Sequence, residues 1–461
     1  MSTRRISSVA HVGNIAIGGN NPIRIQSMAT TDTNDTEGSV AQAKRIIDAG
    51  GELVRFTTQG TREAENMKNI SARLKADGYQ TPLVADVHFT AHTADIAAQY
   101  CEKVRINPGN YVDPGRTFKH LEYTDEEYAE ELKKIENKLV PFINICKEHH
   151  TAVRIGVNHG SLSDRIMSRY GDTPEGIVES CMEFLRIFRR EQFDDVVISI
   201  KASNTVVMVT TVRLLVKTMD AEDMHYPLHL GVTEAGEGED GRIKSAVGIG
   251  ALLTEGIGDT IRVSLSEEPE CEIPVARKLV DLIPECTRLR QEAEASIKDD
   301  TITLNIPSVA TESQPTAQSM SCASRFSRED DWETFQLKAA MAVGALLIDR
   351  KATKLVITSD TSTTSPTSLT SLADAILQAA RIKAATSHLV GLKIGIMGCI
   401  VNGPGEMADA DYGYVGAGRG KISLYKQKVC VEKNIPEEEA VERLLQLIEE
   451  DAPNLGKPRK T

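Results

Sequence analysis

Short apolar runs alternate with helical stretches along the first half of the chain. From Ile23 to about Ser264, a β-branched or aliphatic run ends in a polar residue, and a stretch such as Ser39–Ala49 or Pro174–Arg189 follows. Eight strand–helix units at this spacing predict a (β/α)8 barrel. A doubly wound open sheet is the alternative, but no glycine-rich nucleotide-binding turn follows a predicted strand. The runs predicted to be strands are Ile23–Ile25, Leu53-Val54, Leu83–Ala85, Val104, Val153, Val196–Ile200, Leu228–Leu230 and Ile261.

The pattern changes after Pro269. Residues 275–296 are predicted to be helical, whereas residues 300–330 are polar and show no clear period. The Ser/Thr-rich run 359–368 is predicted to be a linker or an exposed loop. The other predicted elements are a helix at Phe335–Leu347, a strand at Lys354–Thr358, a helix from Ser371 to about Ser387, a strand at Leu392–Met397, a hairpin around Lys421–Val431 and an acidic helix at Pro436–Glu450.

These elements divide the chain into three predicted regions. We expect the barrel in residues 1–280, a shortened insert or linker in residues 281–370, and a small α+β domain in residues 371–461. Aromatic residues make up only 4% of the chain, which suits buried parallel strands packed through Val, Ile, Leu and Ala.

Charge and cysteine usage narrow the function classes. A formal net charge of −13 disfavours nucleic acid as a partner. The eight cysteines are scattered with no C-x-x-C pair, which indicates a reducing compartment. The sequence has no signal-peptide pattern and no apolar run long enough to cross a bilayer. We therefore expect a cytoplasmic protein without a membrane partner.

Basic residues stand at the ends of five predicted strands. In a (β/α)8 barrel the carboxyl ends of the strands meet at one rim, which carries the chemistry. Guanidinium groups bind phosphate oxygens two at a time, so a cluster in an acidic chain predicts a diphosphate site. Each residue alone could instead be a solvated or salt-bridged strand end. The five are Arg55, Arg105, Arg154, Lys201 and Arg262.

Other polar residues follow the same strands. Asn107, Asn158 and Ser264 could add neutral hydrogen-bond donors. Asp86 and His88 could hold a metal or act through hydrogen bonds, and two ligands leave this open. Glu234 is the best candidate for a general acid or base, because it follows the strand at Leu228–Leu230.

A glycine-rich loop near the C-terminus contains one thiol and one carboxylate. Cys399 and Glu406 lie seven positions apart in Gly398–Glu406, directly after a predicted strand. A thiolate and a carboxylate presented by one loop could share an iron–sulfur cluster. The alternative is that Cys399 is a small buried apolar residue.

Several strings in this chain resemble one enzyme family, the 4-hydroxy-3-methylbut-2-enyl diphosphate synthases of the methylerythritol phosphate route to isoprenoids. The resemblance covers the predicted barrel and the C-terminal region nearly continuously. The strings are Gln26–Met28, Val84–Phe89, Arg105–Asn110, Arg154–Asn158, Lys201–Ser203, Gly231–Gly236, Glu255–Ser264 and Gly398–Glu406.

The resemblance implies a reductive enzyme that uses a [4Fe–4S] cluster. Its substrate would be 2-C-methyl-D-erythritol 2,4-cyclodiphosphate, opened and dehydroxylated with two electrons from ferredoxin or flavodoxin. Matched residue by residue, Glu234 would transfer a proton, with Asp86, His88 and Asn158 near the substrate, and Cys399 and Glu406 would ligate iron. The residues implied to bind the diphosphate are Arg55, Arg105, Arg154, Lys201, Arg262 and Ser264.

The chain departs from the family in its cluster ligands. The family takes two further thiolates from a Cys-Pro-x-Cys loop, and no such loop stands before Cys399. The join between Ile382 and Lys383 has the character of an internal deletion. Cys322 is the one upstream thiol in a loop-like setting, and Cys430 is predicted to be a hairpin residue.

Two alternatives to the reductive enzyme therefore stay open. One is an impaired paralogue whose barrel binds the diphosphate without a cluster. The other is a redox-free barrel transferase that acts on a phosphorylated substrate. The family can unite barrel and cluster domain across a homodimer or through its insert, and the sequence does not choose between these arrangements.

Overall fold

The computed structural model of the protein comprises two compact units. One is formed by Met1–Asn158 with Leu162–Ile382, the other by His159–Ser161 with Lys383–Thr461. The residues that the structure describes are 4–87, 90–112, 123–158, 161–171, 173–202, 204–233, 235–236, 238–306, 329–359, 366–381, 394–397, 412–418, 421–426, 429–436, 439–440, 443–444 and 446–448.

The first unit contains an eight-stranded parallel sheet in the order β8-β7-β6-β5-β4-β3-β10-β9. A parallel bridge between Ile198 on β8 and Leu228 before β9 joins the two ends of this sheet. The (β/α)8 barrel predicted from the strand runs is thus confirmed, and each of the eight predicted runs overlaps one of its strands. The strands are β3 (Arg24–Met28), β4 (Leu53–Thr58), β5 (Leu83–Val87), β6 (Lys103–Ile106), β7 (Ala152–Asn158), β8 (Val196–Lys201), β9 (His229–Leu230) and β10 (Thr260–Ile261).

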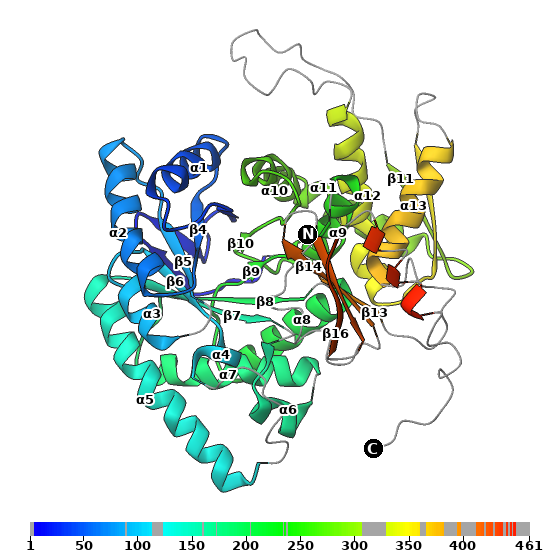
Figure 1. Ribbon diagram of the computed structural model, residues 1–461. Helices are drawn as coiled ribbons and strands as arrows, with labels where there is room; N and C mark the ends of the chain where they lie inside the picture. Colours follow the sequence, from blue (N-terminus) through cyan, green and yellow to red (C-terminus); the bar gives the residue numbers. More distant parts are fainter. Residues whose placement is uncertain are drawn as a thin grey trace. The chain divides into compact units, whose positions relative to one another are not determined.

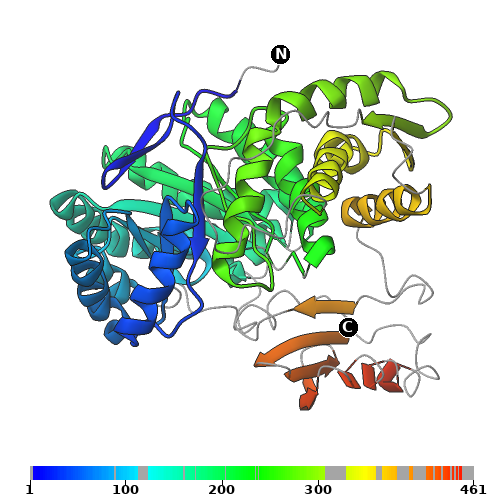
Figure 2. The same cartoon turned by 90° about the horizontal axis from the view of Figure 1, so that it is seen from above.

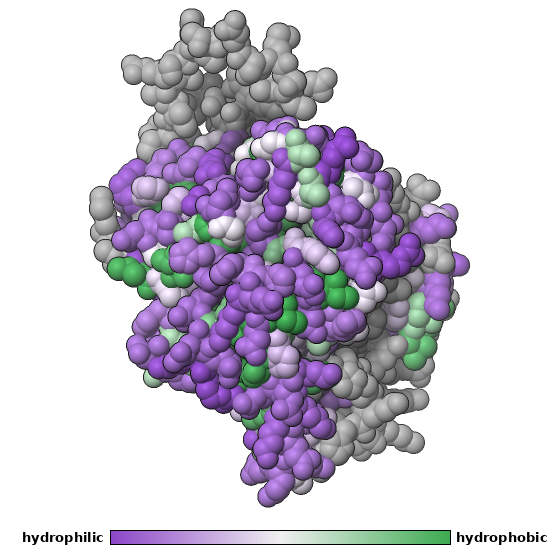
Figure 3. Space-filling model, turned by 90° about the vertical axis from the view of Figure 1, so that its left-hand side faces the viewer, coloured by the Kyte–Doolittle hydropathy of each residue, from purple (hydrophilic) through white to green (hydrophobic). Residues whose placement is uncertain are grey.

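Helices surround the strands (Figure 1). Side-chain caps start several of them: the Asp35 carboxylate accepts from Gly38 N, and the Thr173 hydroxyl accepts from Gly176 N. The outer face seen in Figure 3 is mostly hydrophilic, with apolar residues scattered among polar ones. The helices are α1 (Thr36–Asp48), α2 (Thr61–Ala76), α3 (Ala91–Ala97), α4 (Pro108–Tyr111), α5 (Asp125–His149), α6 (Asp164–Tyr170), α7 (Pro174–Arg190), α8 (Thr205–Ala221), α9 (Gly238–Leu253), the 3-10 turn η2 (Pro269–Cys271) and α10 (Glu272–Asp281).

A hairpin that the sequence analysis did not predict closes the amino-terminal end of the barrel. Strands β1 (Val9–Val12) and β2 (Ile15–Gly18) pair antiparallel. Ala10, Val12 and Ile17 on this hairpin form one buried cluster with the first inward residues of four barrel strands. The barrel residues in that cluster are Leu53, Val84, Ala152 and Val197.

The segment after the barrel packs against it rather than extending away. Helix α12 lies so close to α9 that a Cβ at Gly344 would be 2.8 Å from the Val247 carbonyl oxygen. Strands β11 and β12 pair in parallel, and β11 was missed although Ile302, Leu304 and Ile306 alternate with more exposed residues. The elements are α11 (Ile283–Ala295), β11 (Thr301–Ile306), α12 (Glu329–Ile348), β12 (Lys354–Ser359) and α13 (Pro366–Arg381).

The predicted linker at 359–368 was wrong at its end, because residues 366–368 belong to α13. Pro366 is the first residue of this helix, and its fixed φ suits that position. Residues 360–365 of the predicted linker lie outside the described part of the chain.

The second unit contains a four-stranded sheet in the order β13-β14-β15-β16. Strand β13 pairs in parallel with β14, and the other pairs are antiparallel, as the orange to red arrows in Figure 2 show. Tyr412, Leu424 and Ile435 contribute to its small buried cluster. The strands are β13 (Ile394–Met397), β14 (Tyr412–Gly418), β15 (Lys421–Lys426) and β16 (Val429–Pro436). Among the described helices of the whole chain, none is long and apolar enough to cross a membrane.

Candidate active site

The interior of the barrel is built in layers because alternate residues of each strand face inward. The lowest layer is the apolar cluster against the N-terminal hairpin. Beside it lies a buried polar group, which we call the floor. Gln26 pairs in register with Leu53 of the apolar cluster, and Lys103 pairs with Val84 and Ala152. The floor residues are Gln26, Lys103, Ser199, His229 and Thr260. Further toward the carboxyl ends lies a charged group, which we call the mouth: Arg55, Asp86, Arg105, Arg154, Lys201 and Arg262. Arg55 and Arg154 were expected at strand ends but lie in the middle of β4 and β7.

Asp86 holds two of the mouth arginines. Its Oδ1 is 3.1 Å from the Arg105 Nη1, and its Oδ2 is 3.4 Å from the Arg55 Nε. Arg105 also donates to the Gly156 carbonyl at 2.9 Å. A Cβ at Gly156 would be 2.4 Å from the Arg105 Nε, so only glycine there leaves room for this guanidinium. The position of Arg105 is therefore fixed by an ion pair and by a missing side chain.

Glu272 holds a third arginine and was not predicted from the sequence. Arg262 donates to its two carboxylate oxygens at 3.3 and 3.2 Å. The Ser27 hydroxyl donates to Glu272 at 2.8 Å, and the carboxylate lies in the first turn of α10. An acidic residue in the first turn of a helix is a common and unspecific signal, so its proximity to Arg262 was not predictable from the sequence.

The mouth has more cations than carboxylates. Arg55, Arg105, Arg154, Lys201 and Arg262 face only Asp86 and Glu272 as electrostatic partners among the described residues. Burial, together with the neighbouring cations, lowers the pKa of Arg55 to about 10 and those of Arg154 and Lys201 well below their ordinary values. Such an excess is costly in a dry interior and favours a bound anion.

Unused donors point to the same ligand. Within the described residues, Arg105 Nε and both Nε and Nη1 of Arg154 are buried without a hydrogen-bond partner. Arg154 is 1% exposed and is among the largest fully buried side chains of the protein. Buried N–H groups without partners are rare in native proteins, so these donors indicate an acceptor-rich guest such as phosphate.

The structure places the remaining predicted site residues unequally. Asn107 accepts from Gly109 N at 3.2 Å and caps α4, which gives it a backbone-positioning role. Asn158 is buried at the end of β7, and Ser264 is half-buried after β10. His88, Glu234, Cys399 and Glu406 lie outside the described residues, as does Cys322.

The described thiols do not form a cluster site. Burial raises the pKa of the Cys101, Cys146 and Cys181 thiols far above the usual value, so they are protonated core residues. Cys286 is also buried, while Cys271 is exposed and Cys430 is half-buried on β16. No group of three or more His, Cys, Asp or Glu side chains among the described residues is arranged to hold a metal ion.

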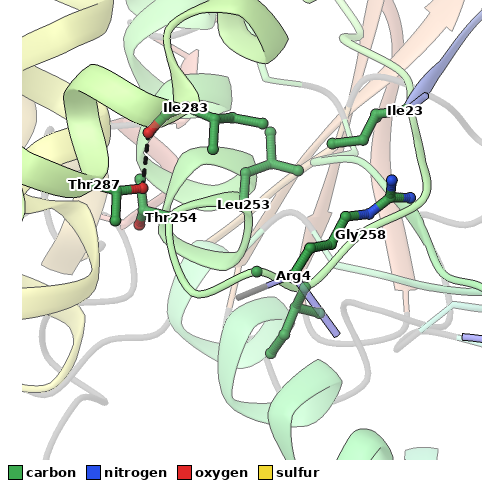
Figure 4. A pocket seen from close by; sticks show the side chains of 9 residues that line it. Arg4, Ile23, Leu253, Thr254, Gly258, Ile283 and Thr287 are labelled. Atoms are coloured by element: carbon green, nitrogen blue, oxygen red, sulfur yellow. Dashed lines mark hydrogen bonds between the residues drawn. The ribbon is translucent and has the colours of Figure 1, made fainter. Parts of the chain in front are cut away.

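A second pocket, away from the mouth, is lined largely by apolar residues and by polar groups that already have partners (Figure 4). Ile23, Leu253 and Ile283 form much of its wall. Its Arg4 guanidinium already binds Asp259 at 2.7 Å, and its Thr287 hydroxyl donates to the Ile283 carbonyl at 2.7 Å. The charged mouth is thus the stronger candidate for an active site.

Two family models match the chain, and together they span both units. The GcpE TIM-barrel domain matches residues 7–277, and the GcpE protein C-terminal domain matches residues 364–450. The first match alone covers more than half of the chain. The chain belongs to the GcpE family.

Bacterial relatives of this GcpE chain carry one name, 4-hydroxy-3-methylbut-2-en-1-yl diphosphate synthase (flavodoxin). The Bacteroides fragilis protein is 49% identical over 620 residues, covering 99% of this chain and 98% of its own. The Bacteroides thetaiotaomicron protein is 50% identical, covering 98% of each chain. The Porphyromonas gingivalis protein is 45% identical, covering 97% of this chain and 98% of its own.

The alignment with the first relative is longer than this GcpE chain. It runs over 620 residues, whereas the chain has 461, so at least 159 aligned positions have no counterpart here. Relatives of this length therefore contain segments that this chain lacks.

Proposed function

We propose that this chain acts as a 4-hydroxy-3-methylbut-2-enyl diphosphate synthase. In this reaction 2-C-methyl-D-erythritol 2,4-cyclodiphosphate is opened and dehydroxylated with two electrons. The name shared by the relatives supports flavodoxin as the electron donor. The observation in the structure that carries the proposal is the cation excess of the mouth, which is suited to a guest with two phosphoryl groups.

Each basic residue of the mouth is proposed to contribute differently to substrate binding. Arg105, held by Asp86 and the Gly156 carbonyl, presents its guanidinium in one orientation. Arg154 supplies buried donors with no other partner among the described residues, and Lys201 adds a compact charge. Arg262 is fixed by Glu272. We propose that these side chains bind the two phosphoryl groups and hold the ring of the substrate in one pose.

Proton transfer and iron binding are assigned by the family pattern. We propose Glu234 as the proton-transfer residue, with His88, Asn158 and Ser264 near the substrate. Cys399 and Glu406 are the residues proposed to hold iron. The described residues do not fit a [4Fe–4S] cluster, because they include no suitable ligand group and their buried thiols are protonated.

The experiment that tests the proposal separates binding from reduction. The chain is reconstituted anaerobically with iron and sulfide, and binding of the cyclodiphosphate is measured by calorimetry before reduced flavodoxin is added. Binding followed by formation of the product supports the proposed function. Binding without turnover, in preparations that hold no cluster, would leave a diphosphate-binding barrel instead.

A matched pair of variants localises the binding site. Arg105→Ala removes a mouth guanidinium and should abolish measurable binding. Arg45→Ala removes an arginine that is half exposed and pairs with Glu270 on the outside of the barrel, and it should leave binding unchanged. Equal binding by both variants would place the substrate elsewhere.

A further inference from the structure

The floor of the barrel is polar where such barrels are usually apolar. Layers inside (β/α)8 barrels are dominated by Val, Ile and Leu. Here the layer beneath the mouth is formed by side chains at most 1% exposed: Gln26, Lys103, Ser199, His229 and Thr260. It borders the apolar cluster formed with the N-terminal hairpin, because Gln26 and Lys103 pair in register with strand residues of that cluster. Its direct neighbours on the other side are the mouth residues.

Many polar atoms of the floor have no partner within the described residues. Lys103 Nζ donates to Gln26 Oε1 at 3.3 Å across the barrel. Gln26 Nε2, both ring nitrogens of His229 and the hydroxyls of Ser199 and Thr260 have none. Buried polar groups without a protein partner are normally bridged by internal water, so the floor is suited to hold ordered water.

Among the described residues, no carboxylate acts on the charged or titratable groups of the floor. The charged groups that act on Lys103 are Arg154 and Arg55, both of the same sign. Those that act on His229 are Arg154, Lys201, Lys103 and Arg55, again all cations. The carboxylates of Asp86 and Glu272 are already engaged with mouth arginines. Burial first, and then these cations, lower the pKa of Lys103 well below its ordinary value and favour the neutral amine.

A dianion bound in the mouth would favour the protonated form of Lys103. The two phosphoryl groups of the proposed substrate would lie in the mouth, one layer above Lys103, and would offset the charges of Arg55 and Arg154. A nearby negative charge favours the protonated form of an amine, and it acts strongly in a region of low dielectric. Both forms of Lys103 can keep the hydrogen bond to Gln26, since the amine donates in either state.

We propose that Lys103 is a positioning residue of the floor that is neutral in the free enzyme and takes up one proton when the cyclic diphosphate binds. The proton comes from solvent and stays on Lys103 Nζ, while His229 remains neutral and relays hydrogen bonds to water. The bound state then gains an ammonium beneath the phosphoryl groups without any contact between Lys103 and the substrate. This inference rests on the proposed function, because it requires the anion in the mouth.

Calorimetry of the full chain with the cyclodiphosphate, without an electron donor, tests the proposal. Binding enthalpies are measured at pH 7.5 in buffers of different ionisation enthalpy, and the slope gives the number of protons exchanged. Each phosphorus of this ligand has a single acidic oxygen, which is fully ionised at this pH, so an exchanged proton belongs to the protein. We expect uptake of close to one proton per ligand, falling to near zero in Lys103→Met.

A matched control and a second measurement guard against a folding defect. Lys338 is also buried, but it pairs with Glu285 at 2.8 Å, so Lys338→Met should leave the proton uptake unchanged. In protein labelled with 13C at the lysine ε carbons, the signal that Lys103→Met removes should shift from the amine to the ammonium position on ligand addition.

The outcomes separate the two proposals. Binding with no proton uptake by the wild-type chain would overturn the role of Lys103 and leave the proposed function standing. Uptake that persists in Lys103→Met would also overturn it, because the proton would then belong to another group such as Lys201. Absence of any binding would overturn both the floor proposal and the proposed function.

Discussion

At the mouth of the barrel, Arg105 and Arg262 each contact a buried carboxylate. In the floor beneath it, Lys103 instead donates to an amide oxygen and has two cations as its charged neighbours. All three side chains are basic and largely withdrawn from solvent. The difference is that Asp86 and Glu272 are positioned to stabilise the charge in the mouth, and no described carboxylate does so in the floor. Burial therefore does not set the charge state of a basic residue here; the partner that is buried with it does.

The largest loss of stability is expected when a carboxylate is removed from the mouth, which leaves its cations without that partner. Asp86→Ala leaves Arg55 and Arg105 buried without this counter-charge, and loss of one partner of a buried ion pair costs about 3–5 kcal/mol. The measurement is the free energy of unfolding in urea. Asp125→Ala removes an exposed carboxylate that pairs with Arg169, and its cost should be within about 1 kcal/mol. Similar losses of unfolding free energy in the two variants would show that Asp86 does not stabilise the buried arginines.

Removal of the basic residue in the floor is expected to increase the free energy of unfolding. Lys103→Met replaces a buried, unpaired amine with an apolar side chain of similar length and should raise the free energy of unfolding by about 1–4 kcal/mol at pH 7.

The gain should depend on pH. Burial lowers the pKa of Lys103 in the folded state, so between that pKa and its ordinary value of 10.5 the unfolded chain binds the extra proton. The cost of the lysine thus grows as the pH falls below 10.5, and the advantage of methionine should shrink when unfolding is measured at pH 10. A destabilised Lys103→Met protein would show that the amine is charged and paired.

Replacing Arg105 with lysine tests whether the geometry of its guanidinium group, and not only its charge, is needed for ligand binding. Arg105→Lys keeps the positive charge but loses the planar fork that bonds Asp86 and the Gly156 carbonyl. The same fork is proposed to bind phosphate oxygens, and loss of one hydrogen bond to a charged group costs about 1.5–3 kcal/mol, so the Kd for the cyclodiphosphate should rise roughly 10- to 100-fold. Arg45→Lys on the outer surface is the matched control and should leave Kd unchanged. An unaltered Kd in Arg105→Lys would mean that charge alone binds the ligand.

The smallest effect is expected from a single added methyl group. Gly156→Ala places a Cβ 2.4 Å from the Arg105 Nε, which forces the guanidinium to move and should cost about 1–3 kcal/mol of stability, with weaker ligand binding. Gly60→Ala serves as control, because its Cβ would meet only the end of the Glu63 side chain at 3.2 Å. Thermal unfolding and calorimetry together would show whether Arg105 has moved.

Strand runs and rim charges were predictable because both are local in sequence. A β-branched run such as Val196–Ile200 must be buried on both faces, and the residue after it must lie at the carboxyl end of the strand. That reasoning grouped Arg105, Arg154 and Lys201, and the structure brings them together, although Arg154 lies in the middle of β7 and not at its end.

Other features escaped prediction because they depend on distant partners. The hairpin of β1 and β2 is too short to show a clear period, and only its packing under the barrel explains why Val12 and Ile17 are buried. Strand β11 pairs with β12 across a long separation in sequence, and its alternation was obscured by neighbouring polar residues. Glu272 became meaningful only when α10 placed it beside Arg262.

Strand periodicity and motif strings can be recognised without any knowledge of the packing, so they were enough to predict the barrel, the family and the basic side chains that follow the strand runs. Three features required the folded chain: which of those side chains share a carboxylate, that Gly156 makes room for Arg105, and that Lys103 and His229 belong to a buried polar group beneath the mouth. Charge states in a barrel interior follow from distances between strands far apart in the chain, and no local pattern records those distances.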